Sequence, residues 1–240
     1  MNSIATASER ELGGAASVLV RQRRDHVDLD RMLEKLPQTS GPGRDQLLNR
    51  LSRLVFPHAF AEESVLWPTI RRVLPEGEAL TLEIEQEHQE INELWTTLER
   101  TPDAERDPLL ARITTVLRED VRDEEDRLFP MLRERLDDTQ LRRLGYAWEA
   151  VRRTAPTRPH PVVARRPPGN ALAAVPLTVL DRARDVADAG ARRVPSRTVR
   201  RGLASSSAVL ARAAGLVENL PPLTRGEDPS TARSRAGGRS

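Results

Sequence analysis

The strongest constraint in this sequence is an internal repeat with a fixed spacing. The segments 58–68 (HAFAEESVLWP) and 120–130 (DVRDEEDRLFP) align without a gap and share Glu-Glu at the fifth and sixth places, then Leu, an aromatic residue and Pro. They begin 62 residues apart, and His26 and His88 are separated by the same interval. Similarities of independent origin would not share one spacing. The repeat therefore predicts two copies of a helical hairpin, folded with pseudo-twofold symmetry.

Apolar residues recur at helical spacing in four long stretches, each closed by turn-forming residues. The core must come mainly from Leu, Val, Ile and Ala, because the chain has only three Trp, three Phe and one Tyr, and this composition suits helices better than sheets. The four patterns cover about 15–36, 44–73, 79–98 and 103–136, and Asp137-Asp138 can cap a shorter fifth helix over 139–153. We therefore predict an all-α protein, with an antiparallel up-down four-helix bundle over residues 15–153.

Two prolines, Pro68 and Pro130, lie inside the second and fourth patterns. A proline removes one backbone hydrogen bond and either ends a helix or bends it. Because the apolar periodicity continues past both prolines, we predict kinks.

Residues 154–240 have a different composition. The stretch 154–170 (TAPTRPHPVVARRPPGN) is rich in Pro and Arg, which predicts a linker without a regular core. Beyond it, Leu177, Leu180 and Val186 could line one short helix, and Leu203 and Leu210 another. The last residues, from 224 onward, have the composition of a disordered segment. We predict a Pro/Arg/Ala-rich extension that is mostly disordered, with short helices possible.

Charge and composition exclude several classes of protein. Residues 1–150 carry 21 basic and 30 acidic side chains, whereas 151–240 carry 17 and 6. The basic extension has no aromatic residue and no recognisable nucleic-acid motif, so specific nucleic-acid binding is not expected. Docking of the extension on the acidic bundle is the alternative role for its positive charge.

The absence of Cys excludes disulfides and Fe–S clusters. No apolar run approaches the roughly 18 residues that span a bilayer, and the start lacks the pattern of a signal peptide, so we expect a cytoplasmic protein with no membrane partner.

The repeat also places metal-binding residue types at helical spacing. Residues at i and i+4 share one helix face, so His58 with Glu62 can hold one centre, and so can Asp120 with Glu124. Bundles build dinuclear sites from such pairs, and imidazole with carboxylate suits iron, with manganese or zinc less suited. Pseudosymmetry brings His26 and His88 to the same axis. The candidate metal ligands are His26, His58, Glu62, His88, Asp120 and Glu124.

Over residues 17–136 this pattern resembles the hemerythrin-like, or HHE cation-binding, proteins. That family takes one His from each of helices one and three, and a His-x-x-x-Glu pair, often followed by Leu-Phe-Pro, from each of helices two and four. His26, His58 with Glu62, His88 and Glu124 fall on these places, and the trailing element matches at 66–68 and 128–130. One position departs from the pattern, because the family usually has His where this chain has Asp120.

The resemblance implies a non-haem di-iron centre that binds, senses or detoxifies oxygen species or nitric oxide. Its expected ligand is a small diatomic molecule or peroxide. With the pseudosymmetry, His26 and His58 serve one iron, His88 and Asp120 the other, and Glu62 and Glu124 bridge the two. Some members place the second carboxylate one residue later, which makes Glu125 a reserve candidate and Glu63 a weaker one. The alternatives are a di-iron oxidase or peroxidase, or a metal-free helical interaction scaffold; the protein partner is not indicated.

Each candidate also has a purely structural interpretation. A single helical His among charged neighbours is usually a solvated surface residue, but three of the four His residues of this chain occupy repeat positions. One Glu of each Glu-Glu pair is expected to be an ordinary exposed charge, and Asp120 faces water if that half of the site has decayed. His160, between two prolines, is not expected to bind metal. Trp67, Trp95 and Phe129 are predicted to pack in the core, and Tyr146, the one phenol of the chain, could lie near the metals.

Overall fold

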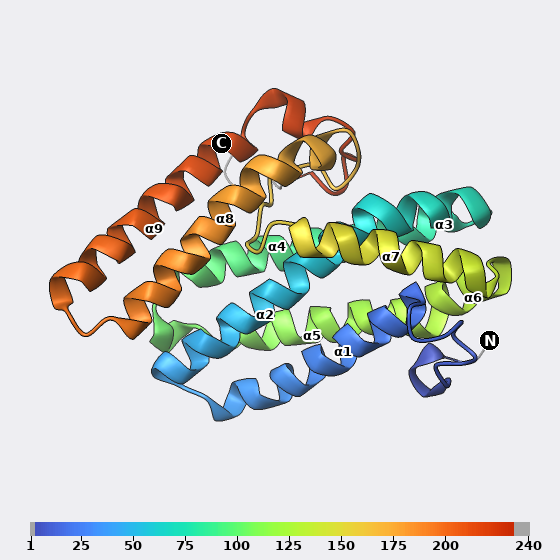
Figure 1. Ribbon diagram of the computed structural model, residues 1–240, viewed down its shortest axis with the longest axis horizontal. Helices are drawn as coiled ribbons and strands as arrows, with labels where there is room; N and C mark the ends of the chain where they lie inside the picture. Colours follow the sequence, from blue (N-terminus) through green and yellow to red (C-terminus); the bar gives the residue numbers. More distant parts are fainter. Residues whose placement is uncertain (1–2, 233–240) are drawn as a thin grey trace, which may run out of the picture.

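The chain folds into helices joined by short connections. The structure, a computed structural model, describes residues 3–232, and this part of the chain contains no β-strand, which confirms the all-helical prediction. In Figure 1 the helices α1 to α7 form the body of the molecule, and α8 and α9 lie along one side of it. Among the described residues, no helix combines the length and the apolar character needed to cross a membrane.

The helices of the body occupy the ranges predicted from the apolar periodicity. The first is α1 (Val18–Lys35), and the third is α4 (Gly77–Arg100). The second pattern runs through α2 (Gly41–Ala61), a π-helix η3 (Glu62–Leu66) and α3 (Trp67–Val73). The fourth runs through α5 (Asp107–Asp123), a second π-helix η5 (Glu124–Leu128) and α6 (Phe129–Arg135). Short 3-10 turns are η1 (Ile4–Thr6), η2 (Leu36–Gln38), η4 (Asp103–Glu105) and η6 (Pro221–Thr224).

The two prolines of the repeat are accommodated by wider helical turns. Both helices continue past Pro68 and Pro130, as predicted. Just before each proline, an N–H bonds five residues back instead of four: Trp67 donates to the Glu62 carbonyl, and Phe129 donates to the Glu124 carbonyl. Because proline has no N–H and its ring crowds the carbonyl four residues earlier, a regular α-helix cannot continue through it unchanged. The two copies of the repeat share this irregularity as well as their sequence.

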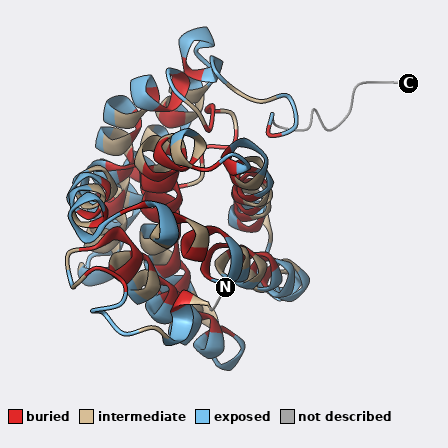
Figure 2. Ribbon diagram, turned by 90° about the vertical axis from the view of Figure 1, so that its right-hand side faces the viewer, coloured by how far each residue is buried: buried red, intermediate tan, exposed pale blue. Residues whose placement is uncertain are grey.

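Two apolar clusters lie on either side of a polar layer, which contains His26 and His88. One contains Trp67, Phe129 and Trp148, and the other is built around Phe56 and Trp95, so the predicted core positions of the aromatic residues are confirmed. Figure 2 shows the buried residues along the inner sides of the helices. In α1 and in α4 the chain leaves the first cluster and enters the second, and one histidine lies between them in each helix.

The fifth helix, α7 (Asp138–Thr154), closes the body against α1 and α2. Its N-terminus has a capping box, in which the Asp137 side chain and Gln140 each bond the other's backbone N–H. Gly145 allows a close approach to the chain before α1, since a Cβ at this position would lie 2.0 Å from the carbonyl oxygen of Ala16. This approach brings Trp148 against the polar layer.

The extension is more ordered than the sequence predicted. Helices α8 (Gly169–Arg193) and α9 (Arg197–Glu218) pack against each other, so the prediction of a mostly disordered extension with short helices is wrong for these residues. Most residues of the linker 155–165 are buried as well. Residues 233–240, at the end predicted to be disordered, lie outside the described residues. The predicted domain boundary between 153 and 154 stays a prediction.

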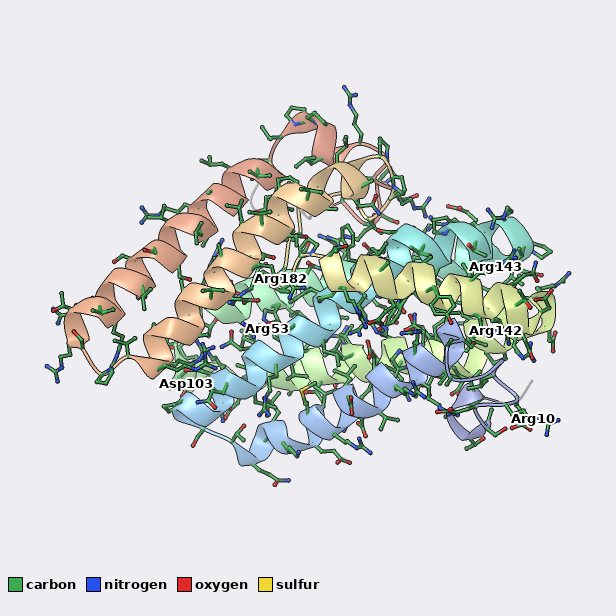
Figure 3. All side chains as sticks on the ribbon, in the orientation of Figure 1. Arg10, Arg53, Asp103, Arg142, Arg143 and Arg182 are labelled. Carbon is green, nitrogen blue, oxygen red and sulfur yellow. The ribbon has the colours of Figure 1, made fainter. Side chains whose placement is uncertain are left out.

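Charged groups hold the extension together. Asp181 of α8 is fully buried; it accepts hydrogen bonds from the backbone N–H groups of 157–158, at 2.9 Å each, and lies 3.1 Å from Nε2 of His160. Asp185, one turn later, forms an ion pair at 3.1 Å with Arg53 of α2, which is labelled in Figure 3. Counting apolar residues could not reveal this packing, because the hydrogen bonds between the linker and α8 are made by polar and charged groups.

We expect Asp181→Ala to lower the free energy of unfolding by about 3–5 kcal/mol, because it leaves a buried His160 and two backbone N–H groups without their acceptor. Denaturant unfolding followed by circular dichroism measures the change. The matched control is Asp188→Ala, whose carboxylate pairs with Arg158 but keeps 27% of its side chain exposed; there the loss should stay within about 1 kcal/mol. Equal losses in the two variants would contradict the assignment.

Candidate metal centre

Three buried histidines from three helices direct their Nε2 atoms to one region. His26 belongs to α1, His58 to the last turn of α2, and His88 to α4. The Nε2 atoms of His26 and His58 lie 3.3 Å apart, and Nε2 of His88 lies 3.4 Å from a carboxylate oxygen of Asp120 in α5. The fold thus brings together residues that are far apart in the sequence and that the repeat placed on a common axis.

A carboxylate orients each histidine at its other ring nitrogen. Nδ1 of His26 lies 2.8 Å from Glu125, and Nδ1 of His88 lies 2.9 Å from Glu63. Nδ1 of His58 lies 3.1 Å from Asp25. An imidazole that donates Nδ1–H to a carboxylate has its Nε2 lone pair available for a metal, and this arrangement is usual around metal-binding histidines.

Glu62 and Glu124 lie between the histidines. Both are fully buried, and each is the first residue of its π-helix. Oε1 of Glu62 is 3.0 Å from Nε2 of His58, and Oε2 is 3.6 Å from Nε2 of His88. Oε2 of Glu124 is 3.2 Å from Nε2 of His26. Glu62 therefore faces histidines of both hairpins, as a bridging carboxylate must.

The donor atoms form two groups that share Glu124. One group is His26, His58, Glu62 and Glu124, the other is His88, Asp120 and Glu124, and within each group the ligand atoms lie within 4.8 Å of one another. Within these two groups, four buried oxygens make no hydrogen bond to the described residues: Glu62 Oε2, Asp120 Oδ1 and both oxygens of Glu124. Burying such carboxylates is costly unless a cation neutralises them. The donor set therefore fits metal cations.

Comparison with protein families identifies this part of the chain. Residues 17–132 match the family model described as the hemerythrin HHE cation binding domain. Residues 17–132 belong to the hemerythrin family. The match contains all six predicted ligands and confirms the resemblance seen in the sequence. No curated protein and no solved structure matches the chain.

Carboxylates in the hemerythrin domain change the pKa values of the histidines. Burial disfavours the charged form of His26, but the close carboxylates of Glu124 and Glu125 outweigh burial and raise its pKa to about 9. The pKa of His58 and that of His88 are also raised well above the usual value, again against the effect of burial. Burial and the negative charges of nearby carboxylates raise the pKa of Glu124. Protons therefore compete with a metal for the same donor atoms.

The sequence interpretation was wrong about the second Glu of each pair. One Glu of each pair was expected to be exposed, yet Glu63 and Glu125 keep only 1% and 9% of their surface exposed, and both contact a histidine. Successive side chains of an α-helix point about 100° apart, so helical periodicity places consecutive residues on different faces. The π-helices add a residue to this turn and let both Glu residues face inward.

A further signal in the repeat was overlooked. Asp25 and Glu87 directly precede His26 and His88, and they lie 62 residues apart. Asp25 orients His58, as described above. Glu87 lies near Asp120, and burial together with the negative charge of Asp120 raises the pKa of Glu87 to about 8. An acidic residue before each repeat histidine could have indicated that further carboxylates, Asp25 and Glu87, lie close to the donor atoms.

Other candidates from the sequence lie elsewhere or have other roles. Tyr146 is 62% exposed and lies near Arg21, so it is not part of the buried centre. His160 lies between Asp181 and Glu218 in the extension. Asp120 is buried, so it does not face water. Three aromatic rings surround the centre: Trp67 stacks on His88, Phe129 stacks on His26, and Trp148 meets His58 edge-on.

We expect the protein, once stripped of metal, to become less stable as the pH rises from about 6.5 to about 9. The folded protein binds the His26 proton more tightly than the unfolded chain, whose pKa is near 6.5. The stability that this tighter proton binding gives to the folded protein is fully present below pH 6.5 and is lost as the pH rises through 9. Denaturant unfolding after chelation measures it, and His26→Gln should show a smaller decline. Equal stability at pH 6.5 and 9 would contradict the expectation.

Proposed function

We propose that the hemerythrin domain holds two iron ions and uses them to bind, sense or detoxify a small oxygen species or nitric oxide. The observation that carries the proposal is the arrangement of the three histidines. Each has Nδ1 on a carboxylate and Nε2 toward the same buried, incompletely satisfied carboxylates. The two donor groups, which share Glu124, support two ions better than one.

The roles of the residues follow from their positions. His26 and His58 are assigned to one ion, and His88 and Asp120 to the other. Glu62 and Glu124 lie between the groups and are assigned as bridges. Mixed imidazole and carboxylate donors favour iron, with manganese or zinc less suited. When bound, two ferrous ions would supply the electrons that reduce an oxygen species. Glu125, Asp25 and Glu63 hold the imidazoles in the orientation that binding requires.

A small cavity beside the donor atoms supports a small ligand. It has a volume of about 20 Å³, which is room for one water-sized molecule. Apart from the histidines and Asp120, its lining is mostly apolar, with Leu29, Phe56 and Leu117 among the lining residues. A wider surface depression between α1 and α5 shares His26, Leu29 and Leu117 with it. A diatomic molecule matches this size and polarity better than an organic substrate does.

We expect Glu62→Ala to lower iron affinity by more than the roughly 10–100-fold that is typical for loss of an outer hydrogen-bonding partner, because it removes a direct ligand. Iron per chain is measured after anaerobic loading with Fe(II) and competition with a chelator. Glu83→Ala is the control, since Glu83 is a glutamate of α4 with 58% of its side chain exposed. Equal iron content in both variants and in the unmodified protein would overturn the proposed site.

Asp120 makes this donor set more negative than the usual family pattern. Three carboxylates, from Glu62, Asp120 and Glu124, face the centre where the resemblance predicts two. A hard anionic oxygen donor favours the higher charge of ferric iron. The reduced protein should therefore be oxidised rapidly by oxygen and should be a poor reversible carrier.

We expect Asp120→His to slow the oxidation of the reduced, iron-loaded protein by oxygen, because a neutral imidazole replaces an anionic ligand. Stopped-flow absorbance after mixing with oxygen gives the rate. Asp123→His is the matched control, because Asp123 ends α5 with 38% of its side chain exposed and pairs with Arg127. If Asp120→His and Asp123→His oxidise at the same rate as the unmodified protein, Asp120 does not tune the iron.

A further inference from the structure

The extension reaches the metal centre through one side chain, Arg165. This residue lies in the linker between α7 and α8 and keeps 7% of its surface exposed. Its guanidinium nitrogen lies 3.6 Å from Oε1 of Glu63. The same oxygen lies 2.9 Å from Nδ1 of His88. A cation from outside the family match therefore contacts the carboxylate that orients one of the three histidines.

Arg165 is held in place from several directions. Its backbone N–H donates to Glu227 at 2.6 Å, and its guanidinium donates to the His160 carbonyl at 2.9 Å. The backbone N–H of His160 donates in turn to Asn92, one helical turn after His88 in α4. Asn170 of α8 donates to the Arg165 carbonyl at 3.0 Å. The backbone of Arg165 is thus held by α8 and by Glu227, and its guanidinium is held by the His160 carbonyl, whose residue is bonded to α4.

The other half of the pseudosymmetric centre has a more exposed cation at a different carboxylate: Arg152 of α7 lies 3.5 Å from Asp25, which orients His58, and keeps 27% of its side chain exposed. Glu125 orients His26 as Glu63 orients His88, but no arginine within residues 3–232 pairs with Glu125. Glu125 is also somewhat more exposed than Glu63. The repeat alone would make Glu63 and Glu125 equivalent. The extension removes that equivalence by placing a buried guanidinium beside Glu63.

We propose that Arg165 is a positioning residue of the metal centre, which acts through Glu63 on His88 and makes the extension part of the site. This inference rests on the proposed iron-binding function. By fixing Glu63, Arg165 holds the His88 imidazole in its binding orientation. Its positive charge also disfavours the higher positive charge of a ferric ion at the nearer iron position. Loss of the guanidinium therefore weakens binding of one iron and stabilises the ferric state, which lowers the reduction potential.

The experiment compares Arg165→Met, Arg165→Lys and Arg166→Met in the full chain. Arg166 is the matched control, because it anchors the same linker through Glu78 and Glu85 of α4 without contacting a proposed ligand or the carboxylates that orient them. Fe(II) is loaded anaerobically, iron per chain is measured against a competing chelator, and the potential is measured by spectroelectrochemistry. We expect Arg165→Met to lower the affinity for one iron ion by about 10–100-fold and to shift the reduction potential of the centre to a more negative value. The reduction potential of Arg165→Lys should lie closer to that of the unmodified protein, because lysine keeps the positive charge.

The outcomes separate this inference from the proposed function. If the unmodified protein holds no iron, both fail. If it holds iron, and Arg165→Met matches Arg166→Met in iron affinity and potential, Arg165 has only a structural role and this inference alone is wrong. Should Arg165→Met fail to fold, Arg165→Gln provides a neutral polar variant with the same expectations, and circular dichroism of the metal-free forms establishes that the compared variants are folded.

Discussion

The fold depends on hydrogen bonds that cross between the two helical hairpins. Glu125 of the second hairpin orients His26 of the first, and Glu63 of the first orients His88 of the second. These groups lie in a polar layer between two apolar clusters, where an unpaired carboxylate or imidazole is costly. The Nδ1 atoms of His26 and His88 find their carboxylate partners in the other hairpin. Pairing of the hairpins therefore completes the centre, and changes at the centre should act on stability as well as on metal binding.

The π-helices explain how two neighbouring glutamates serve different purposes. In each repeat the first Glu faces the donor cluster, and the second turns to a histidine ring of the other hairpin. A regular α-helix separates consecutive side chains too widely for both to face the same layer. The Leu-aromatic-Pro element that follows imposes the wider turn, and it also supplies the aromatic rings that stack on His88 and His26. The proline and the paired glutamates thus form one functional unit of the sequence.

The residues that could be located from the sequence are those whose position depends on periodicity. The four helical stretches and the six candidate ligands follow from helical spacing and from the repeat, and the structure brings all six side chains together. Glu63 and Glu125 could not be placed, because their burial depends on a π-turn that hydropathy does not encode. The order of α8 and α9 was missed for another reason: the linker is attached through Asp181, Arg158 and Arg166, and charged side chains usually indicate solvent exposure.

This attachment changes the significance of the arginine-rich composition. Arginine keeps its charge when buried and donates in several directions, which allows a short proline-rich linker to be fixed by ion pairs and hydrogen bonds in addition to the small apolar cluster that contains Val163. Arg158 binds acidic groups of α8, Arg166 binds acidic groups of α4, and Arg165, adjacent to Arg166, reaches Glu63. The opposite charges of the two halves of the chain are therefore used locally, at a few buried contacts. Because one of these contacts ends at a carboxylate that orients a histidine, the extension adds an asymmetry to a centre in which Asp120 already differs from its repeat counterpart, His58.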